Sequence, residues 1–242
     1  MLFRATLAAI GLLASAPLAS AATVTVTDLT SNPSAYADWL ATTSGSAVET
    51  FEDEGAALGG ARGVEYSGPV STSVGTFSTL GGRGTGGTVS RAPFANTGTG
   101  LALRSGSVYG RSNTTEGGNW FLDSNDTKGI AWSIDMGINF KSVAFTISDM
   151  ADTGAIFDLI VNNDVIWSAS RMAASAKQLF VIDFGSTMSA SDNVQLVFRN
   201  SKTNDGFSLD DVTLATTPLP ATALLLLGGL GGLVAMRRRK TA

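Results

Sequence analysis

Two pairs of acidic residues, one in each half of the chain, are the clearest candidates for chemistry in this sequence. Glu52 and Asp53 lie in its first quarter, and Asp210 and Asp211 lie near its end. If the first and last strands of the fold pair, the four carboxylates come together, and neighbouring like charges repel unless a cation lies between them. Calcium takes about six to eight oxygen ligands, typically from such carboxylates. The pattern predicts a calcium site at these four residues, and the alternative is a set of solvated acids at strand ends.

Aromatic residues offer a second kind of site, because the face of an aromatic ring can stack on a sugar. Trp120 follows the polar stretch 117–119, and Tyr109 lies in a polar segment between Ser107 and Arg111. Both are therefore expected on loops, and Tyr109 and Trp120 are the candidate carbohydrate-binding residues. The alternative is that they pack at the rim of the core, where Trp132 is expected because it lies on an apolar strand face.

The sequence contains neither cysteine nor histidine, which excludes several kinds of chemistry. Without cysteine there is no disulfide bond and no thiolate nucleophile. Without either residue type, an ordinary zinc site and any catalytic unit with a histidine base are excluded. Pairs of carboxylates can hydrolyse glycosides when they lie about 5 to 10 Å apart across the scissile bond. Nothing in the sequence marks such a pair.

Two further segments have a weaker resemblance to ligand-binding loops. Segment 123–129 begins like an EF-hand calcium loop, but its glycine falls one position late, and Ile134 stands where the loop needs a glutamate. The run 81–87 is rich in glycine but lacks the Gly-Lys-Ser/Thr ending of a phosphate-binding loop. Both segments are predicted to be loops without these ligands.

Residues 1–21 have the form of a secretory signal peptide. Arg4 precedes the apolar run 5–16, and Ala19 and Ala21 form a small-residue cleavage site. We predict a signal helix, cleavage after Ala21 and a mature chain that begins at Ala22. The alternative is a membrane anchor, which the short apolar run disfavours.

Residues 217–242 form a second terminal segment with three parts. The motif Pro218-Leu219-Pro220-Ala221 comes first, an apolar run to residue 236 follows, and the end is basic, with Arg237, Arg238, Arg239 and Lys240. The apolar part predicts a hydrophobic helix about 24 Å long, slightly short of a bilayer core of about 30 Å. Because clustered basic residues stay in the cytoplasm, the preceding domain is expected on the other side of the membrane.

This order of motif, apolar run and basic cluster resembles the PEP-CTERM class of bacterial sorting signals, in the variant named after the motif Val-Pro-Leu-Pro-Ala. Thr217 stands where that motif has valine. The resemblance implies recognition by an exosortase, cleavage near the motif, and delivery to the surface or matrix of a Gram-negative bacterium that produces polysaccharide. The alternatives are a degenerate sortase signal at 219–223, a GPI signal, and a tail anchor that is not cleaved. A GPI signal would not end in basic residues.

The domain between the terminal segments, residues 22–216, is more acidic than the whole chain. The chain has 16 Lys and Arg and 20 Asp and Glu; five of the basic residues lie in the terminal segments, and every acidic residue lies in the domain. The net charge of −4 for the chain therefore becomes −9 for the domain. Because phosphate contacts need Lys and Arg, nucleic acid is excluded as a partner.

The pattern of the domain is that of an all-β protein, because short apolar runs alternate with clusters of Gly, Ser, Thr, Asn and Asp. Asn162-Asn163 is predicted to be a hairpin turn and Asp205-Gly206 another turn. The clearest strands are predicted at 130–136, 143–147, 155–161, 165–167, 180–184, 194–198 and 207–214. We predict an antiparallel two-sheet sandwich of the jelly-roll kind.

Two regions of the domain depart from this strand pattern. Asn32 is a suitable helix cap and Pro33 suits the first helical position, so one short N-terminal helix is predicted at 33–41. Residues 55–118 show no clear strand pattern, and the glycine-rich run 81–87 within them is predicted to form a long surface loop or an edge hairpin.

The runs 48–53 and 205–214 also resemble the first and last strands of PEP-CTERM ectodomains, which are similar to strands of jelly-roll carbohydrate-binding modules. The resemblance implies that these strands are neighbours and share a structural calcium ion. We therefore predict an exported, non-enzymatic structural or adhesive module that associates with exopolysaccharide and holds calcium. A carboxylate-dependent glycoside hydrolase that acts on matrix polysaccharide is the alternative from another class.

Overall fold

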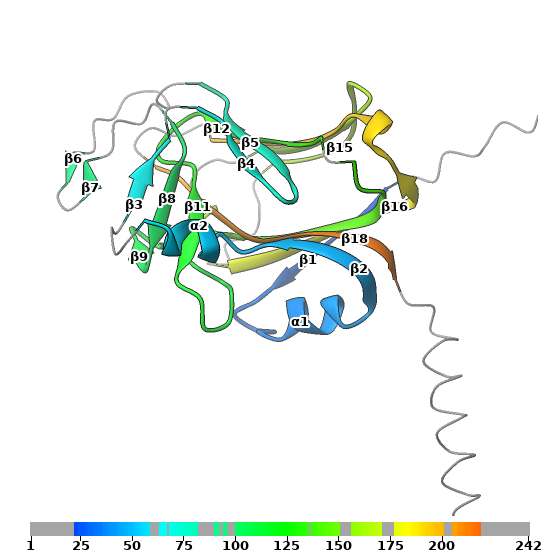
Figure 1. Ribbon diagram of the computed structural model, residues 1–242, viewed down its shortest axis with the longest axis horizontal. Coiled ribbons are helices and arrows are strands. Elements are labelled where there is room, and N and C mark those ends of the chain that lie inside the picture. Colours follow the sequence, from blue (N-terminus) through cyan, green and yellow to red (C-terminus); the bar gives the residue numbers. More distant parts are fainter. Residues whose placement is uncertain are drawn as a thin grey trace, which may run out of the picture.

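Two antiparallel sheets form the two layers of the protein (Figure 1). The computed structural model describes residues 22–58, 63–66, 68–81, 90–91, 94–95, 100–135, 137–150, 156–170, 177–200 and 205–218. The prediction of a mostly β protein with antiparallel sheets and few helices is confirmed. The terminal segments 1–21 and 219–242 lie outside the described residues, and so does most of the glycine-rich run 81–87.

Sheet A has eight strands, and its last strand in sequence is one of its central strands. Along the sheet the order is β1 (Thr23–Asp28), β16 (Lys177–Met188), β13 (Phe140–Ser148), β18 (Ser208–Pro218), β11 (Trp120–Asp123), β8 (Ala102–Ser105) and β3 (Gly63–Glu65), with β2 (Thr43–Glu49) also paired to β18.

Sheet B has six strands, and short elements complete the fold. Its order is β15 (Asp164–Ser170), β14 (Ile156–Val161), β17 (Val194–Arg199), β12 (Gly129–Ile134), β5 (Gly75–Thr79) and β4 (Val70–Thr72). Two small hairpins join β9 (Ser107–Val108) to β10 (Arg111–Ser112) and β6 (Ser90–Arg91) to β7 (Phe94–Ala95). The helices are α1 (Ala35–Leu40), α2 (Glu52–Ala56) and the 3-10 turn η1 (Ala190–Asp192).

Aromatic rings from both sheets fill the space between the layers. Phe145 of sheet A stacks on Phe180 at 5.1 Å between ring centroids and meets the edge of Phe157 of sheet B at 5.6 Å. Trp132 is fully buried, which confirms its predicted place in the core. Burying a large apolar side chain contributes roughly 1.5–3 kcal/mol, so this cluster is the main source of adhesion between the sheets.

Strand β18 joins the two halves of sheet A. One of its edges pairs with β13, while the other pairs first with β11, at Leu209↔Leu122, and then with β2, at Val212↔Glu49. Between these two pairings lie Asp210 and Asp211, where the register with β13 also shifts and Asp211 has a φ of 49°. The predicted pairing of an early strand with the last strand is thus confirmed.

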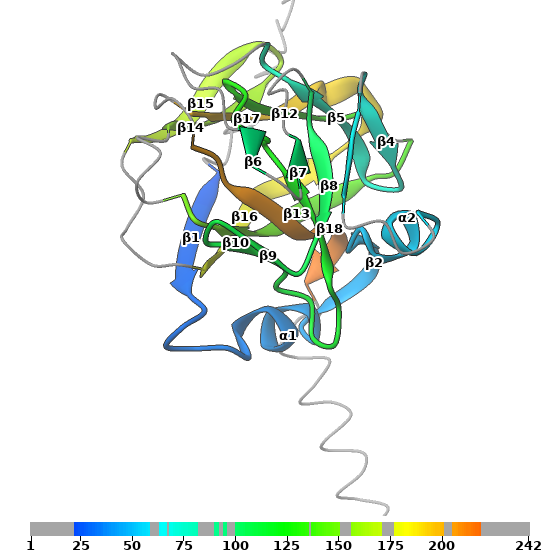
Figure 2. The ribbon, with the colours of Figure 1, turned by 90° about the vertical axis from the view of Figure 1, so that its left-hand side faces the viewer.

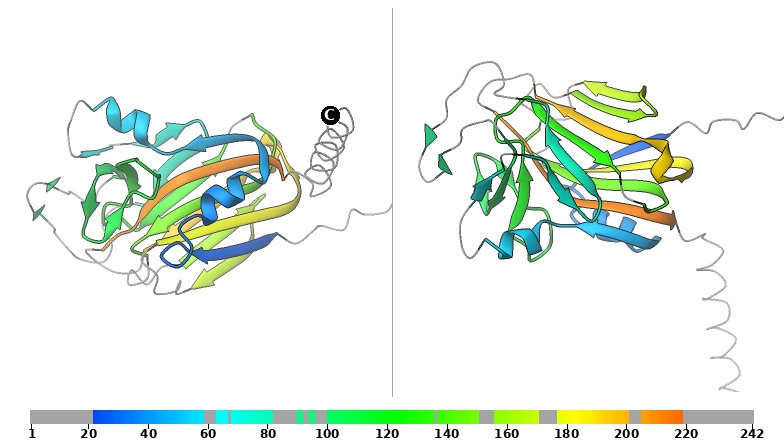
Figure 3. Two further views of the ribbon diagram at one scale, coloured as in Figure 1. Left: turned by 90° about the horizontal axis from the view of Figure 1, so that it is seen from below. Right: turned by 45° about the horizontal axis from the view of Figure 1, so that its top comes forward.

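Local signals in the sequence place one hairpin turn and one helix correctly. Asn162 and Asn163 have φ values of 52° and 71° and join β14 to β15, as expected of a tight hairpin turn with two left-handed residues. Helix α1 lies within the predicted 33–41, but its cap position is Ser34 rather than Asn32. The Tyr36 hydroxyl and the Thr213 hydroxyl lie 2.7 Å apart, which fixes α1 on the outer face of sheet A (Figure 3).

One prediction of local structure was wrong. The run 48–53 is not one strand, because Phe51 adopts a left-handed φ of 60° and turns the chain from β2 into α2. Residues 55–118, where the sequence shows no clear strand pattern, contain β3, β4, β5, β8, β9 and β10. The strands formed there are too short for an alternating pattern of apolar and polar residues to reveal them.

The first and last described residues lie at the same end of the sandwich. Because β1, β16, β13 and β18 alternate in direction, β1 begins where β18 ends. Strand β18 runs through Thr217 and Pro218, two residues beyond the expected boundary at 216, and Pro218 pairs with Thr43. Within the described part of the chain, no helix is long and apolar enough to cross a membrane.

Candidate functional site

The acidic pair of β18 lies buried in the gap between β11 and β2. Asp210 is fully buried, and Asp211 is 2% exposed. The Thr114 N–H donates to Asp210 Oδ2 at 2.7 Å. The hydroxyls of Thr114 and Thr115 donate to the two carboxylate oxygens of Asp211, each at 2.7 Å. Two carboxylates and two hydroxyls therefore form one compact, oxygen-rich cluster.

Burial and mutual repulsion raise the pKa values of this pair. Burial raises the pKa of Asp210 to about 8, and the charge of Asp211 adds to the effect against the amide donors of Thr114 and Thr115. Burial also raises the pKa of Asp211, and the Thr114 and Thr115 hydroxyls oppose that rise. At neutral pH the pair therefore holds a proton unless another positive charge takes its place.

Glu52 and Asp53 do not join this cluster as ligands, which corrects the four-residue prediction. Glu52 Oε1 accepts hydrogen bonds from the backbone N–H groups of Asn119 at 2.7 Å and Trp120 at 2.8 Å. Asp53 is exposed. Both residues belong to α2 rather than to a strand, and the charge of Glu52 contributes to the raised pKa of Asp211. In the described part of the chain, no group of three or more acidic side chains is placed to hold a metal ion.

The segment Ser112–Thr115 lies across the outer face of sheet A and covers the pair (Figure 2). The Ser208 hydroxyl of β18 donates to the Ser112 carbonyl at 3.1 Å, and the Ser148 hydroxyl of β13 does so at 3.2 Å. Lys177 Nζ donates to the Asn113 carbonyl at 2.9 Å. Sequence reasoning missed Thr114 and Thr115, because threonine is too common here for two of them to stand out.

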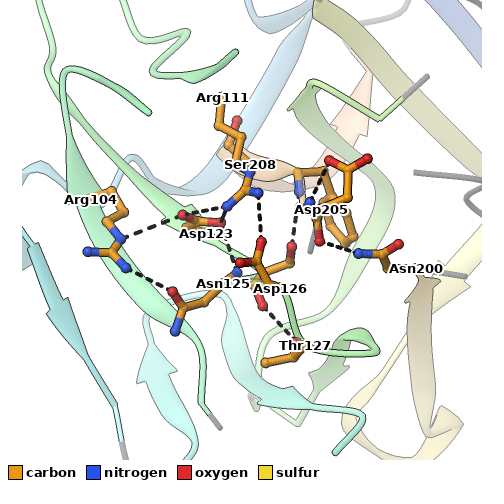
Figure 4. A network of polar contacts seen from close by, with 12 residues as sticks. Arg104, Arg111, Asp123, Asn125, Asp126, Thr127, Asn200, Asp205 and Ser208 are labelled. Atoms are coloured by element: carbon orange, nitrogen blue, oxygen red, sulfur yellow. Dashed lines mark hydrogen bonds and ion pairs between the residues drawn. The ribbon is translucent and has the colours of Figure 1, made fainter. Parts of the chain in front are cut away.

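A buried ionic network lies beside the start of β18 (Figure 4). Arg111 donates to Asp123 Oδ1 at 2.9 Å and to Asp126 Oδ1 at 2.8 Å, and Arg104 donates to Asn125 Oδ1 at 2.8 Å. These five residues are at most 6% exposed. The segment that begins like an EF-hand loop is thus a buried turn. Its acidic side chains are balanced by the guanidinium group of Arg111.

The segment before β18 is shaped by this network. A Cβ atom added to Gly206 would lie 2.7 Å from Arg111 Cζ and 2.7 Å from Ser124 Oγ. A side chain at position 206 would therefore displace the Arg111 guanidinium or Ser124. Asp205 and Gly206 do not form the turn predicted there, and the small size of Gly206 makes room for the ionic network.

The two candidate aromatic residues have opposite environments. Tyr109 is 55% exposed at the tip of the β9–β10 hairpin and has a φ of 52°. Trp120 is only 8% exposed, and a Cβ atom added to Gly55 of α2 would fall 2.1 Å from its ring. Trp120 is therefore a packing residue beneath α2, so its proposed sugar contact is withdrawn, while Tyr109 keeps an accessible ring.

A second acidic pair was not foreseen from the sequence. Glu49, at the end of β2, is 7% exposed and accepts a hydrogen bond from the Phe51 N–H at 2.7 Å. Burial raises the pKa of Glu49 to about 7, and the charge of Glu54 adds to the rise against the Phe51 donor. Only the left-handed turn at Phe51 brings Glu54 back to Glu49, and no local pattern announces that turn.

Comparisons with known proteins find structural similarity but no family. No protein-family model and no curated protein matches the chain. Solved structures with similarity include the catalytic unit of a GH87 α-1,3-glucanase from Streptomyces thermodiastaticus, with 10% identity, a TM-score of 0.30, and coverage of 64% of this chain and 25% of that one. Another is the xylanase 10B CBM22-1–GH10 modules of Clostridium thermocellum, with 17% identity, a TM-score of 0.28, and coverage of 71% and 28%.

A third similar structure is a single binding module. It is the family 11 carbohydrate-binding module of a Clostridium thermocellum cellulosomal cellulase, with 13% identity, a TM-score of 0.29, and coverage of 72% of this chain and 97% of the module. This chain thus spans about a quarter of the first two structures and nearly all of the third. Similarity at these TM-scores carries no argument about function, so the chain's own residues must supply one.

Replacing Arg111 by methionine tests the role of the ionic network. We expect the free energy of unfolding to fall by about 3–5 kcal/mol, because Asp123 and Asp126 would stay buried without their main partner. Arg199→Met is the matched control, since the Arg199 side chain is 49% exposed in its ion pair with Asp158, and it should cost about 1 kcal/mol or less. Urea unfolding followed by tryptophan fluorescence measures both, and equal losses would contradict the assignment.

Proposed function

We propose that this chain is an exported module of the cell surface or extracellular matrix that binds exopolysaccharide and does not act on it as an enzyme. The observation that carries the proposal is the exposed Tyr109 ring on the β9–β10 hairpin. This hairpin continues into Ser112, which contacts Ser208 at the start of β18. The β9–β10 hairpin therefore lies at the end of the sandwich opposite to the one where β1 begins and β18 ends (Figure 1).

The placement of the hairpin and the two chain ends at opposite ends of the sandwich suits a protein that is delivered and held by its terminal segments. The domain would present the Tyr109 end to its surroundings, while the predicted signal peptide and sorting segment leave from the opposite end. The buried ionic network lies directly behind the hairpin, because Arg111 belongs to β10. A rigidly mounted aromatic ring loses little conformational entropy on binding, which favours adhesion. A jelly-roll connectivity for the two sheets belongs to the same proposal.

The runner-up function is a glycoside hydrolase that uses carboxylates. Two pairs of carboxylates among the described residues raise each other's pKa values or are raised by a neighbour, Asp210 with Asp211 and Glu49 with Glu54. Asp210 and Asp211 are neighbours on one strand and receive protein hydrogen bonds rather than facing each other across an open space. A hydrolase needs opposed carboxylates with room for a sugar between them, so the geometry favours binding.

Polysaccharide binding predicts a specific effect of Tyr109→Ala. The full chain should be retained on exopolysaccharide from producing cells, and the variant should bind about tenfold more weakly, since loss of one aromatic contact costs about 1.5 kcal/mol. Val165→Ala, at a residue 58% exposed on β15, is the control and should bind like the parent. Accumulation of reducing ends that Glu49→Gln abolishes would instead identify a hydrolase.

We further propose that Asp210 and Asp211 hold a structural calcium ion. Calcium uses oxygen ligands only, and the two carboxylates with the Thr114 and Thr115 hydroxyls offer such a set. Their burial and raised pKa values support the proposal, because a cation would remove the repulsion that now requires a proton. Glu52 and Asp53 are left out of this version of the site.

The calcium proposal gives a pH dependence with a definite sign. Because the folded-state pKa of Asp210, about 8, exceeds the unfolded value of about 4, the folded state binds more protons, and stability falls as pH rises from about 4 to 8. In the presence of a chelator, the melting midpoint of the parent should fall as the pH rises over this range. The fall should be less steep in Asp210→Asn, where the titration of Glu49 still contributes. Calcium at pH 8 should raise the midpoint of the parent but not of Asp210→Asn, and no shift in the parent would exclude the ion.

Sorting by an exosortase predicts the covalent form of the exported chain. Mass spectrometry of protein released from cells should show a chain that begins at Ala22 and lacks Arg237, Arg238 and Arg239. The cut should fall beyond Pro218, because Pro218 is still paired within sheet A. Released protein that retains the basic cluster would refute processing, and full-length protein found only in the membrane fraction would indicate a permanent tail anchor.

A further inference from the structure

The strands at the sheet borders differ in how they are protected from pairing with another chain. The border strands among the described residues are β1 and β3 of sheet A, β4 and β15 of sheet B, and β2, which pairs only with β18. An exposed border offers unpaired backbone groups, and proteins protect it with short strands, bulges, charges or a covering segment.

Four of these five strands carry such protection. Strands β3 and β4 have three residues each. Strand β15 has a bulge opposite Leu159 and Ile160, which bends its border. Strand β2 is interrupted by Gly45 at a φ of 58°, and the Ser73 hydroxyl donates to its Val48 carbonyl.

Strand β1 carries none of these features before its last residue, Asp28. Its six residues pair with β16 in continuous register, from Thr23↔Asp183 to Asp28↔Gln178. The alternating sequence Thr23–Thr27 contains no Lys, Pro or Gly and no charge. Figure 3 shows β1 along the border of sheet A, beside β16 and clear of α1.

The exposure of Val26 indicates that this border has room for a further apolar contact. Val24 and Val26 lie on the same face of β1, and Val24 packs against the core. Val26 nevertheless remains 45% exposed. An added strand beside β1 would cover Val26 and pair the backbone groups of the border.

We propose that β1 is an interface between two copies of this chain, whose β1 strands pair antiparallel about a two-fold axis. Two domains with a net charge of −9 repel each other, so a second copy approaches most easily where the facing surfaces are uncharged, and the stretch Thr23–Thr27 is such a surface. An antiparallel pair of identical strands is self-complementary and closes as a dimer, whereas a parallel pair of identical borders does not.

Charge complementarity at the ends of the strand supports the same arrangement. With Thr25 opposite Thr25 of the second copy, Asp28 lies opposite position 22. If the signal peptide is removed as proposed, the new amino group of Ala22 would face that carboxylate twice in the dimer. This pair of charges rests on the proposed function, whereas the pairing of the strands does not.

The arrangement also fixes how the two copies are oriented. Strands β1 and β18 are antiparallel within one copy, so reversing β1 in the partner points the two Pro218 ends in opposite directions. Two copies held in one membrane could not pair in this way. Under the proposed export, the contact therefore joins copies on opposed surfaces or copies already released.

The absence of cysteine makes a direct test possible. Single cysteines are placed in the full chain at each position from Thr23 to Thr27, and disulfide-linked dimer is measured after mild oxidation. Opposed Cα atoms in antiparallel strands lie about 4.5–5.5 Å apart, within the reach of a disulfide. We expect cross-linking at least fivefold above Val165→Cys, an equally exposed border residue of β15, with a maximum at the central position and a decline toward both ends.

A mixing experiment separates the possible arrangements. Thr23→Cys and Thr27→Cys should each cross-link poorly alone but well when mixed, since antiparallel pairing places them opposite each other. Equal cross-linking at every second position, without a gain on mixing, would indicate parallel strands and overturn the proposal. Cross-linking no greater than that of Val165→Cys would overturn it as well, whether or not polysaccharide binding by Tyr109 is found.

Discussion

The placement of β18 in the middle of sheet A is the constraint on which the rest of the structure depends. It is the last described strand, yet it joins β13 on one side to both β11 and β2 on the other. Its apolar residues Leu209, Val212 and Leu214 are fully buried. Sheet A cannot close before this strand is present, so the core, the acidic pair and the segment over it all depend on the final residues of the domain.

The same strand explains why charged groups are buried at two adjacent places. On one side of the start of β18, the acids Asp123 and Asp126 are balanced by Arg111. Within β18, Asp210 and Asp211 have threonine donors, and the charge of Lys177 opposes the rise in the pKa of Asp211. A buried carboxylate must be neutralised by a counter-charge or by a proton. The network uses arginine, and the pair in β18 uses a proton or, as proposed, calcium.

Sequence patterns predicted those parts of the fold that depend on neighbours along the chain. Alternation located the long strands, and Asn162-Asn163 located a hairpin, because both signals are local. The left-handed turn at Phe51 has no such signal, since a bulky residue at positive φ is exceptional. That one residue moved Glu52 and Asp53 into a helix, and it brought Trp120 beneath α2, which explains two failures of the predicted site.

The members of the site that are adjacent in sequence are the ones that sequence reasoning could bring together. Asp210 and Asp211 are neighbours on β18, so they had to lie close to each other. Their partners Thr114 and Thr115 come from a segment about a hundred residues earlier, and Arg111 of β10 reaches Asp123 of β11. Such pairings depend on which segment crosses which sheet, a choice made by the whole topology. The segment that crosses here carries Tyr109 at one end and the donors to Asp210 at the other, so the exposed ring and the acidic pair share one support.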